Sequence, residues 1–111
     1  MIALTRRDAR EAAFIVLFQV DVGRMRPETA IETTLNDTIS RLAIGWTLDR
    51  MGAVDRNLLR LAVYEILFFD DIPINVAINE AVTLARKYGD DESWKFINGI
   101  LGKLAREMKE E

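Results

Sequence analysis

Three arginines near the amino terminus form the most concentrated group of residues with binding chemistry in this sequence. Arg6 and Arg10 are four residues apart, and Arg7 and Arg10 are three apart. In a helix this spacing places side chains on one face, so the three guanidinium groups can converge on one exposed patch. Guanidinium groups bind phosphate oxygens through paired hydrogen bonds, which predicts a nucleic-acid contact. The alternative is a solvated helix end whose charge Asp8 and Glu11 partly neutralise.

Candidates for catalysis are few. The 111 residues contain no cysteine and no histidine, which excludes thiol nucleophiles, disulfides, thiolate zinc sites and the commonest general base. In VAINEAV, Asn79 and Glu80 place one carboxylate beside an amide, without a second titrating group at a fixed spacing. We therefore predict a binding protein that is not an enzyme and that needs no metal or cofactor.

The charge balance limits how the chain could bind nucleic acid. Eighteen acidic residues against 15 basic ones give a formal net charge of -3, so any RNA site must depend on local clustering of cations. No apolar run approaches the roughly 18 residues of a membrane span, and the first residues do not resemble a signal peptide. We expect one cytoplasmic globular domain over residues 1–111, without membrane association.

The elements that position these residues are all expected to be helices, and residues 55–101 contain three of them. The first opens with Asp55 as its N-cap and is apolar on several sides. The second begins at Pro73, whose fixed φ suits a first helical position. It ends before Gly89, which we expect to adopt the left-handed conformation. The third begins within the acidic residues 90–93.

Two further helices are expected upstream. The first runs from Thr5, as N-cap, to about Val22. The second runs from about Glu28 to Trp46, because apolar residues recur there every three or four positions. These patterns predict an all-α antiparallel bundle of about five helices, with a helical pair in residues 1–48 and a three-helix unit in residues 49–111.

Several strings in this chain resemble the NusB family of bacterial transcription antitermination factors. They are DRNLLRLAVYEILFFDDIP, VAINEAVTLARKYG and SWKFINGIL, in that order and at the family's separations. With the arginine-bearing first helix, the match covers most of the chain. The resemblance implies a NusB-like bundle that recognises a single-stranded boxA-type element in nascent ribosomal RNA. It further implies joint recognition with NusE, a small-subunit ribosomal protein, on the elongating RNA polymerase complex.

The resemblance also assigns RNA-binding residues. Arg6, Arg7 and Arg10 occupy the positions of the family's arginine-rich segment, which binds boxA RNA. Phe96, with its neighbour Lys95, matches an aromatic residue at the RNA surface, where an exposed ring can stack on an unpaired base. The alternative is that Phe96 fills the seam against the first helix.

A protein-binding surface is implied at the start of the central helix. By resemblance, the acidic residue Asp55 lies where the family receives NusE, although an N-cap role alone would also explain it. Arg56 and Arg60 are four residues apart on the only polar strip of this helix, so we expect them to flank the same surface. Glu65 is expected near it.

The amino-terminal half departs from the family. NusB proteins usually have three helices there, whereas this chain has room for two. Loss of a packed helix should uncover an apolar groove on the order of several hundred Å². We expect a second copy to cover it, giving a homodimer packed side by side or by exchange of the first helix at residues 23–27. The alternative is that the remaining helices tilt to close the gap.

Two other functions remain open. A NusB-like bundle also occurs at the amino terminus of ribosomal RNA cytosine methyltransferases, as an RNA-binding accessory domain, but that function would need a longer chain with a methyl-donor site. The chain could instead be a dimerising protein-interaction module that has lost RNA binding. Gly99 and Gly102, within the last helix, are expected to permit close helix packing.

Overall fold

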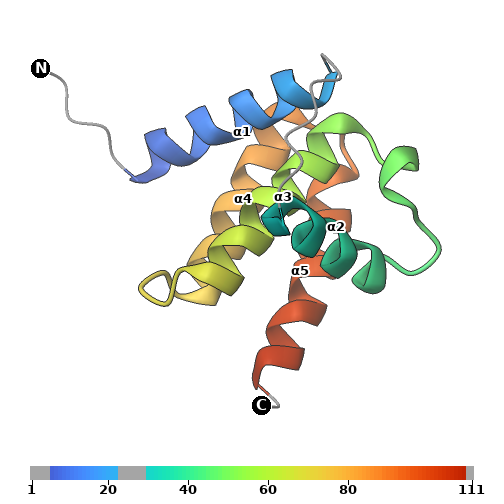
Figure 1. The fold of residues 1–111 in the computed structure, drawn as a ribbon. Coiled ribbons are helices and arrows are strands. Elements are labelled where there is room, and N and C mark those ends of the chain that lie inside the picture. Colours follow the sequence, from blue (N-terminus) through green and yellow to red (C-terminus); the bar gives the residue numbers. More distant parts are fainter. Residues whose placement is uncertain (1–5, 23–29, 110–111) are drawn as a thin grey trace, which may run out of the picture.

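The computed structural model describes residues 6–22 and 30–109, except the side chains of residues 6, 8, 9, 12, 16, 19, 20, 30 and 31. Within these ranges the chain forms helices and no strand (Figure 1). They are α1 (Arg6–Val22), α2 (Ala30–Leu42), the 3-10 turn η1 (Leu48–Arg50), α3 (Ala53–Phe68), α4 (Ile74–Tyr88) and α5 (Ser93–Lys109). The predicted all-α fold is confirmed.

Helix α3 is the centre of the bundle, because α1, α2, α4 and α5 all pack on it. Its side chains Leu58, Leu59 and Val63 have no exposed surface. This explains why its sequence is apolar on several sides instead of along one stripe. In Figure 1, α1 crosses the bundle at one end, and α5 runs to the opposite end.

Three predicted helix ends are wrong by one to a few residues. Helix α4 begins at Ile74, so Pro73 is its N-cap and not its first residue. Helix α3 begins at Ala53, with Gly52 as the residue before it, so Asp55 lies in the first turn and is not the N-cap. Helix α2 ends at Leu42, and Trp46 lies beyond it. The chain turns there because Gly45 adopts a φ of 85°, which an L side chain rarely takes.

Gly89 follows α4 as predicted, but not as a left-handed residue. Its φ of −91° and ψ of −174° are extended. A Cβ at this position would lie 2.5 Å from the Cβ of Ser93 and 2.7 Å from the carbonyl oxygen of Ala85. Glycine is therefore needed here for its small size, so that the end of α4 can approach the start of α5 closely.

The two glycines of α5 do not pack closely against another helix, contrary to the sequence-based expectation. A Cβ at Gly99 would meet no atom within 4 Å, and one at Gly102 would meet only the guanidinium of Arg106, at 3.6 Å. Gly99 is exposed. Both positions face open surface because α5 packs through its other side, which carries Ile97, Ile100, Leu101 and Leu104.

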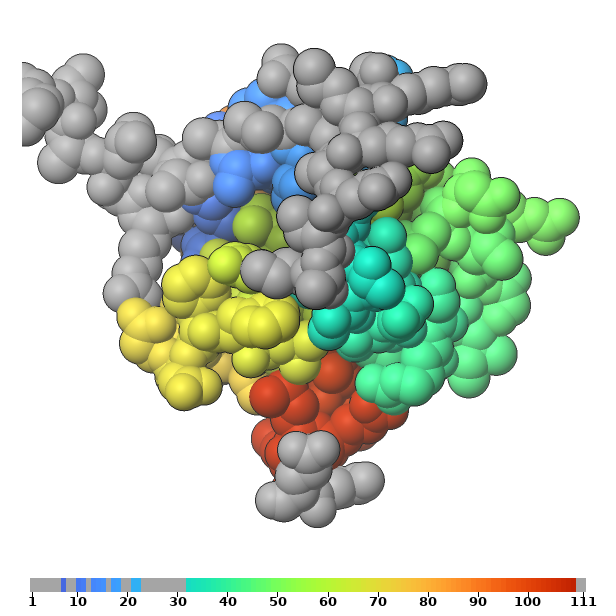
Figure 2. All heavy atoms as spheres, viewed as in Figure 1, coloured from blue at the N-terminus to red at the C-terminus, as the bar shows by residue number. Residues whose placement is uncertain are grey.

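An aromatic cluster is exposed where α3 ends. Tyr64 lies 5.2 Å from Phe68 and 5.3 Å from Phe69 between ring centroids, and Phe68 and Phe69 are 48% and 40% exposed. Figure 2 shows this part of the chain, coloured yellow, at the surface beside α2. No helix of the described ranges is both long enough and apolar enough to cross a membrane.

Candidate functional site

Arg7 and Arg10 of α1 both contact carboxylates on other helices. The Nε and Nη2 of Arg7 donate to the two carboxylate oxygens of Glu80 on α4, at 3.0 and 2.8 Å. The Nε of Arg10 donates to Oε1 of Glu65 on α3 at 2.7 Å, and its Nη1 lies 3.7 Å from Glu80. These contacts attach α1 to α3 and α4.

The two arginines differ in exposure. The side chain of Arg7 is 70% exposed, whereas Arg10 is 7% exposed and Glu65 is also 7% exposed. The prediction of one exposed arginine patch is therefore wrong for Arg10, and Glu65 lies inside the bundle and not on a partner surface. The side chain of Arg6 lies outside the described residues. The sequence did not reveal these pairs because the carboxylates are 55 and 73 residues away from their arginines.

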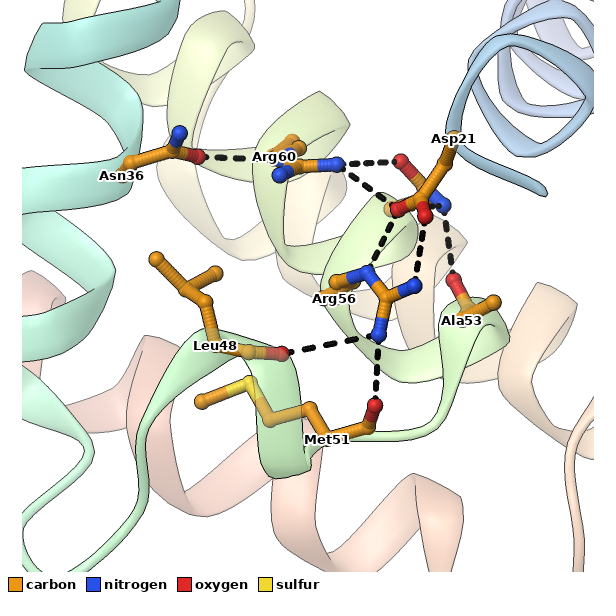
Figure 3. Close-up of polar contacts among 8 residues, drawn as sticks. Asp21, Asn36, Leu48, Met51, Ala53, Arg56 and Arg60 are labelled. Carbon is orange, nitrogen blue, oxygen red and sulfur yellow. Dashed lines mark hydrogen bonds and ion pairs between the residues drawn. The ribbon is translucent and has the colours of Figure 1, made fainter. Parts of the chain in front are cut away.

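A second polar cluster surrounds Asp21, near the end of α1 (Figure 3). Both carboxylate oxygens of Asp21 accept hydrogen bonds from Arg56 of α3. The Nη1 of Arg60 and the amide nitrogen of Asn57 also donate to Asp21, at 2.9 and 3.0 Å. Arg60 further donates from Nε to Asn36 of α2 at 3.0 Å. The carboxylate thus joins α1 to α3, and Arg60 extends the cluster to α2. The hydrogen bonds with Arg56 lower the pKa of Asp21.

Arg56 also fixes the segment that leads into α3. Its Nη1 donates to the carbonyl oxygen of Met51 at 2.6 Å and to that of Leu48 at 3.5 Å (Figure 3). The side chains of Arg56 and Arg60 are 19% and 15% exposed. The expectation that they flank an exposed surface is therefore wrong, because they hold the helices and this segment together.

Asp55 lies where the start of α3 meets the start of α5. Its Oδ1 is buried and has no hydrogen-bond partner in the described part of the chain. Burial raises the pKa of Asp55, while the hydrogen bond with Ser93 lowers it and the charge of Asp90 raises it further. Because Oδ1 is buried, it is not accessible to another molecule in this structure, and the contact that involves Asp55 is the one with Ser93 at the start of α5.

Phe96 packs against Trp46 and not in a seam against the first helix. Their ring centroids are 5.6 Å apart at an interplanar angle of 70°. Lys95 is exposed, with its Nζ 5.7 Å from the centroid of Trp94 and 3.8 Å from Glu92. The sequence interpretation had placed Trp46 on the buried stripe of the preceding helix. The signal that could have corrected it is Gly45, which ends the helical pattern one residue earlier.

The expected RNA-binding residues do not come together in one place. The first turns of α1, which carry Arg7, lie on the opposite side of the bundle from the segment between α2 and α3, which carries Trp46 (Figure 1). Any ligand that contacts both Arg7 and Phe96 must therefore extend across the molecule.

Comparison with known proteins gives a consistent family match. The model of the NusB family matches residues 29–106. The chain is 45% identical to the transcription antitermination protein NusB of Heliobacterium modesticaldum, 42% identical to that of Desulforudis audaxviator and 37% identical to that of Bacillus subtilis. Each alignment covers 96% of this chain, and they cover 65%, 97% and 99% of the respective relatives.

Solved structures give the same fold. T. maritima NusB superposes with a TM-score of 0.85 at 36% identity, covering 96% of this chain and 94% of that one. A chain in the crystal structure of a plectonemic RNA supercoil superposes with a TM-score of 0.84 at 26% identity, covering 94% of this chain and 96% of that one. The alignment with the Desulforudis protein extends over 134 positions, more than the 111 residues of this chain. That relative therefore carries sequence with no counterpart here.

Proposed function

Because the chain belongs to the NusB family, whose relatives named above are transcription antitermination proteins, we propose that it binds a boxA-type single strand in nascent ribosomal RNA together with NusE. It acts within the RNA polymerase elongation complex, and therefore in the cytoplasm. The family is one of transcription factors and not of enzymes, which agrees with a binding function that involves no turnover.

The observation that carries this proposal is the extent of the match. Antitermination proteins align with 96% of the chain, so the likeness includes α1 as well as the residues of the family model. A NusB structure has the same bundle at a TM-score of 0.85. The structural neighbour from an RNA crystal adds support for RNA as the ligand.

Of the assigned arginines whose side chains the structure describes, Arg7 is better placed than Arg10 to bind a phosphate group. Its side chain is 70% exposed, and its partner Glu80 can be exchanged for a phosphate group without unfolding α1. The side chain of Glu80 is only 15% exposed, and it keeps the guanidinium of Arg10 at 3.7 Å as a neighbouring cation when Arg7 turns to a phosphate. Arg10 has a different role, because its cation is buried and attaches α1 to Glu65 of α3.

Lys95 and Phe96 supply the second part of the RNA surface. Lys95 is exposed, and its contacts are a long ion pair with Glu92, at 3.8 Å, and an approach of 5.7 Å to the ring centroid of Trp94. The neighbouring Phe96 is partly exposed. A cation beside an aromatic ring suits a single strand, whose phosphates and unstacked bases alternate.

We assign the start of α3 to the protein partner, with Asp55 as its central residue. The support is the resemblance to the family, together with the position of Asp55 in the first turn of α3. Arg56 and Arg60 contribute indirectly, because they fix the segment before α3 and the contact of α3 with α1 and α2.

A homodimer is the second component of the proposal. Tyr64, Phe68 and Phe69 expose an aromatic cluster at the end of α3. The longer Desulforudis relative has sequence that this chain lacks. We infer that a second copy of the chain covers apolar surface here in place of that sequence.

Fluorescence anisotropy with a labelled boxA-type oligonucleotide tests the RNA function. We expect tighter binding than to a scrambled oligonucleotide of equal length, and we expect affinity to fall with salt because phosphate contacts release counterions. Equal affinity for both oligonucleotides would exclude specific RNA recognition by this chain.

A further inference from the structure

Trp46 forms, with Phe96, an exposed aromatic pair that the family resemblance did not assign. The indole is 50% exposed although it contacts a second ring at 5.6 Å between centroids. Because the two rings meet at 70°, Phe96 covers at most one face of the indole. Half of the indole surface therefore stays exposed, where a planar ligand can contact it.

The turn that carries Trp46 is closed by backbone hydrogen bonds and is therefore preorganised. The N–H of Ala43 donates to Ile39 at 2.9 Å, and the N–H of Trp46 donates to Ala43 at 3.0 Å. Gly45 supplies the positive φ of 85° between them. Beyond the turn, the guanidinium of Arg56 holds the carbonyl oxygens of Leu48 and Met51. A fixed ring loses little conformational entropy when a ligand stacks on it.

Cations lie on both sides of the ring pair along α5. Lys95 directly precedes Phe96, and Lys103 follows it by seven residues, which places Lys103 on the same face two turns later. The Nζ of Lys103 donates to the carbonyl oxygen of Leu42 at 3.3 Å, directly before the turn that carries Trp46. Gly99 lies between these lysines, and a Cβ added there would meet no atom within 4 Å. The surface beside the rings is thus open and flanked by positive charge.

We propose that Trp46 is a base-stacking residue of this protein, with Phe96 as its supporting ring. The ligand is single-stranded RNA, which places a base on the open face of the indole and directs neighbouring phosphates to Lys95 and Lys103. This inference rests on the proposed RNA function and adds a residue and a strand path to it. Flanking lysines favour a nucleic acid over an apolar protein segment, because stacking with adjacent cations is the usual recognition of single strands.

Tryptophan fluorescence provides the direct test, because the chain contains two tryptophans. In the variant Trp94→Phe, the emission comes from Trp46 alone. We expect boxA-type RNA to quench it with the same midpoint that anisotropy gives. In the otherwise native chain, Trp46→Ala should weaken RNA binding by about tenfold, and Trp46→Phe should restore most of the affinity. Ile44→Ala is the control, because Ile44 is 79% exposed in the same turn and has no ring.

The outcomes separate this inference from the proposed function. RNA that binds specifically without quenching Trp46, together with unchanged affinity of Trp46→Ala, overturns the stacking role and leaves the RNA function intact. Failure of specific binding by anisotropy overturns both. Loss of NusE affinity in Trp46→Ala with RNA affinity unchanged would assign this surface to a protein and also overturn the inference. The quenching measurement remains decisive if Trp46→Ala does not fold.

Discussion

Arg7 and Arg10 are separated by less than one helical turn, yet the structure gives them different roles. Arg10 is buried against Glu65, where a cation is retained only because a carboxylate neutralises it. The side chain of Arg7 is 70% exposed at the surface, although that of its partner Glu80 is only 15% exposed. Arg10 is therefore structural, whereas Arg7 is the arginine that we propose exchanges its partner for a phosphate group.

These roles predict opposite effects of alanine substitution. Arg10→Ala leaves Glu65 buried without its cation, so the free energy of unfolding should fall by about 3 kcal/mol. Arg7→Ala should change it by less than about 1 kcal/mol, but should weaken RNA binding and reduce the slope of log affinity against log salt by about one. Urea denaturation and anisotropy measure the two effects. Equal stability losses in both variants would contradict the assignment.

Asp21 makes stability depend on pH in the acidic range. Its hydrogen bonds with Arg56 lower the pKa of its carboxyl in the folded state. A lowered folded pKa means that the stabilisation is complete above the unfolded pKa, near 4, and disappears as the pH falls through the folded value. We expect Asp21→Asn to lower the free energy of unfolding by about 2 kcal/mol at pH 7.

The measurement is urea denaturation of both proteins between pH 2 and 7. The difference between wild type and Asp21→Asn should be constant near neutral pH and should shrink below about pH 4. Asp37→Asn, at an exposed position of α2, is the matched control and should behave as wild type. A difference that grows on acidification would refute the proposed ion pair.

At the scale of the helices, two glycines have opposite surroundings. Gly89 lies where the end of α4 approaches the start of α5 closely, and a Cβ added there would clash with the side chain of Ser93. Gly99 lies in the interior of α5 with open space around it. The same substitution should therefore have opposite signs at the two positions.

Gly89→Ala should lower the free energy of unfolding by about 1 to 3 kcal/mol, because the added methyl group forces backbone or side chain to shift. Gly99→Ala should raise it by about 0.5 to 1 kcal/mol, because glycine is a poor residue inside a helix and the methyl group meets nothing. Thermal and urea denaturation of the pair test this. Stabilisation by Gly89→Ala would show that α4 and α5 do not approach as described.

Periodicity predicted the helices well and their ends less well. Caps and apolar patterns predicted all five α-helices of the described ranges, though not the 3-10 turn η1. Packing on α3 requires apolar residues on its neighbours, which is why the patterns are clear. The ends moved where tertiary contacts decide them, as at Trp46, which packs on Phe96 from outside α2. The ion pairs of α1 were not predictable, because local spacing says nothing about carboxylates on α3 and α4.

The whole molecule should assemble through the aromatic cluster at the end of α3. We expect size-exclusion chromatography with light scattering to give a dimer at micromolar concentration, because Phe68 and Phe69 otherwise remain in water. The double variant Phe68→Glu/Phe69→Glu should be monomeric and folded. Ile44→Glu is the control, since it removes an exposed apolar side chain from a different part of the surface. A monomeric wild-type protein would remove the dimer from the account.

The arrangement of the bundle also limits how RNA and protein partners can act together. The first turns of α1, which carry Arg7, and the segment between α2 and α3, which carries Trp46, lie on opposite sides of the bundle (Figure 1). Asp55 lies in the first turn of α3. A short single strand bound to one of these regions alone should have modest affinity. A partner that binds near Asp55 and also contacts the strand would raise that affinity.

Binding of boxA-type RNA with and without NusE tests this account most directly. We predict that saturating NusE lowers the Kd for boxA-type RNA by at least about tenfold, and that saturating RNA lowers the Kd for NusE by the same factor, since coupling between two binding sites is reciprocal. A scrambled oligonucleotide should show no such coupling. If the Kd for boxA-type RNA is unchanged by NusE, or if the scrambled strand binds equally well, joint recognition of RNA by this protein is contradicted.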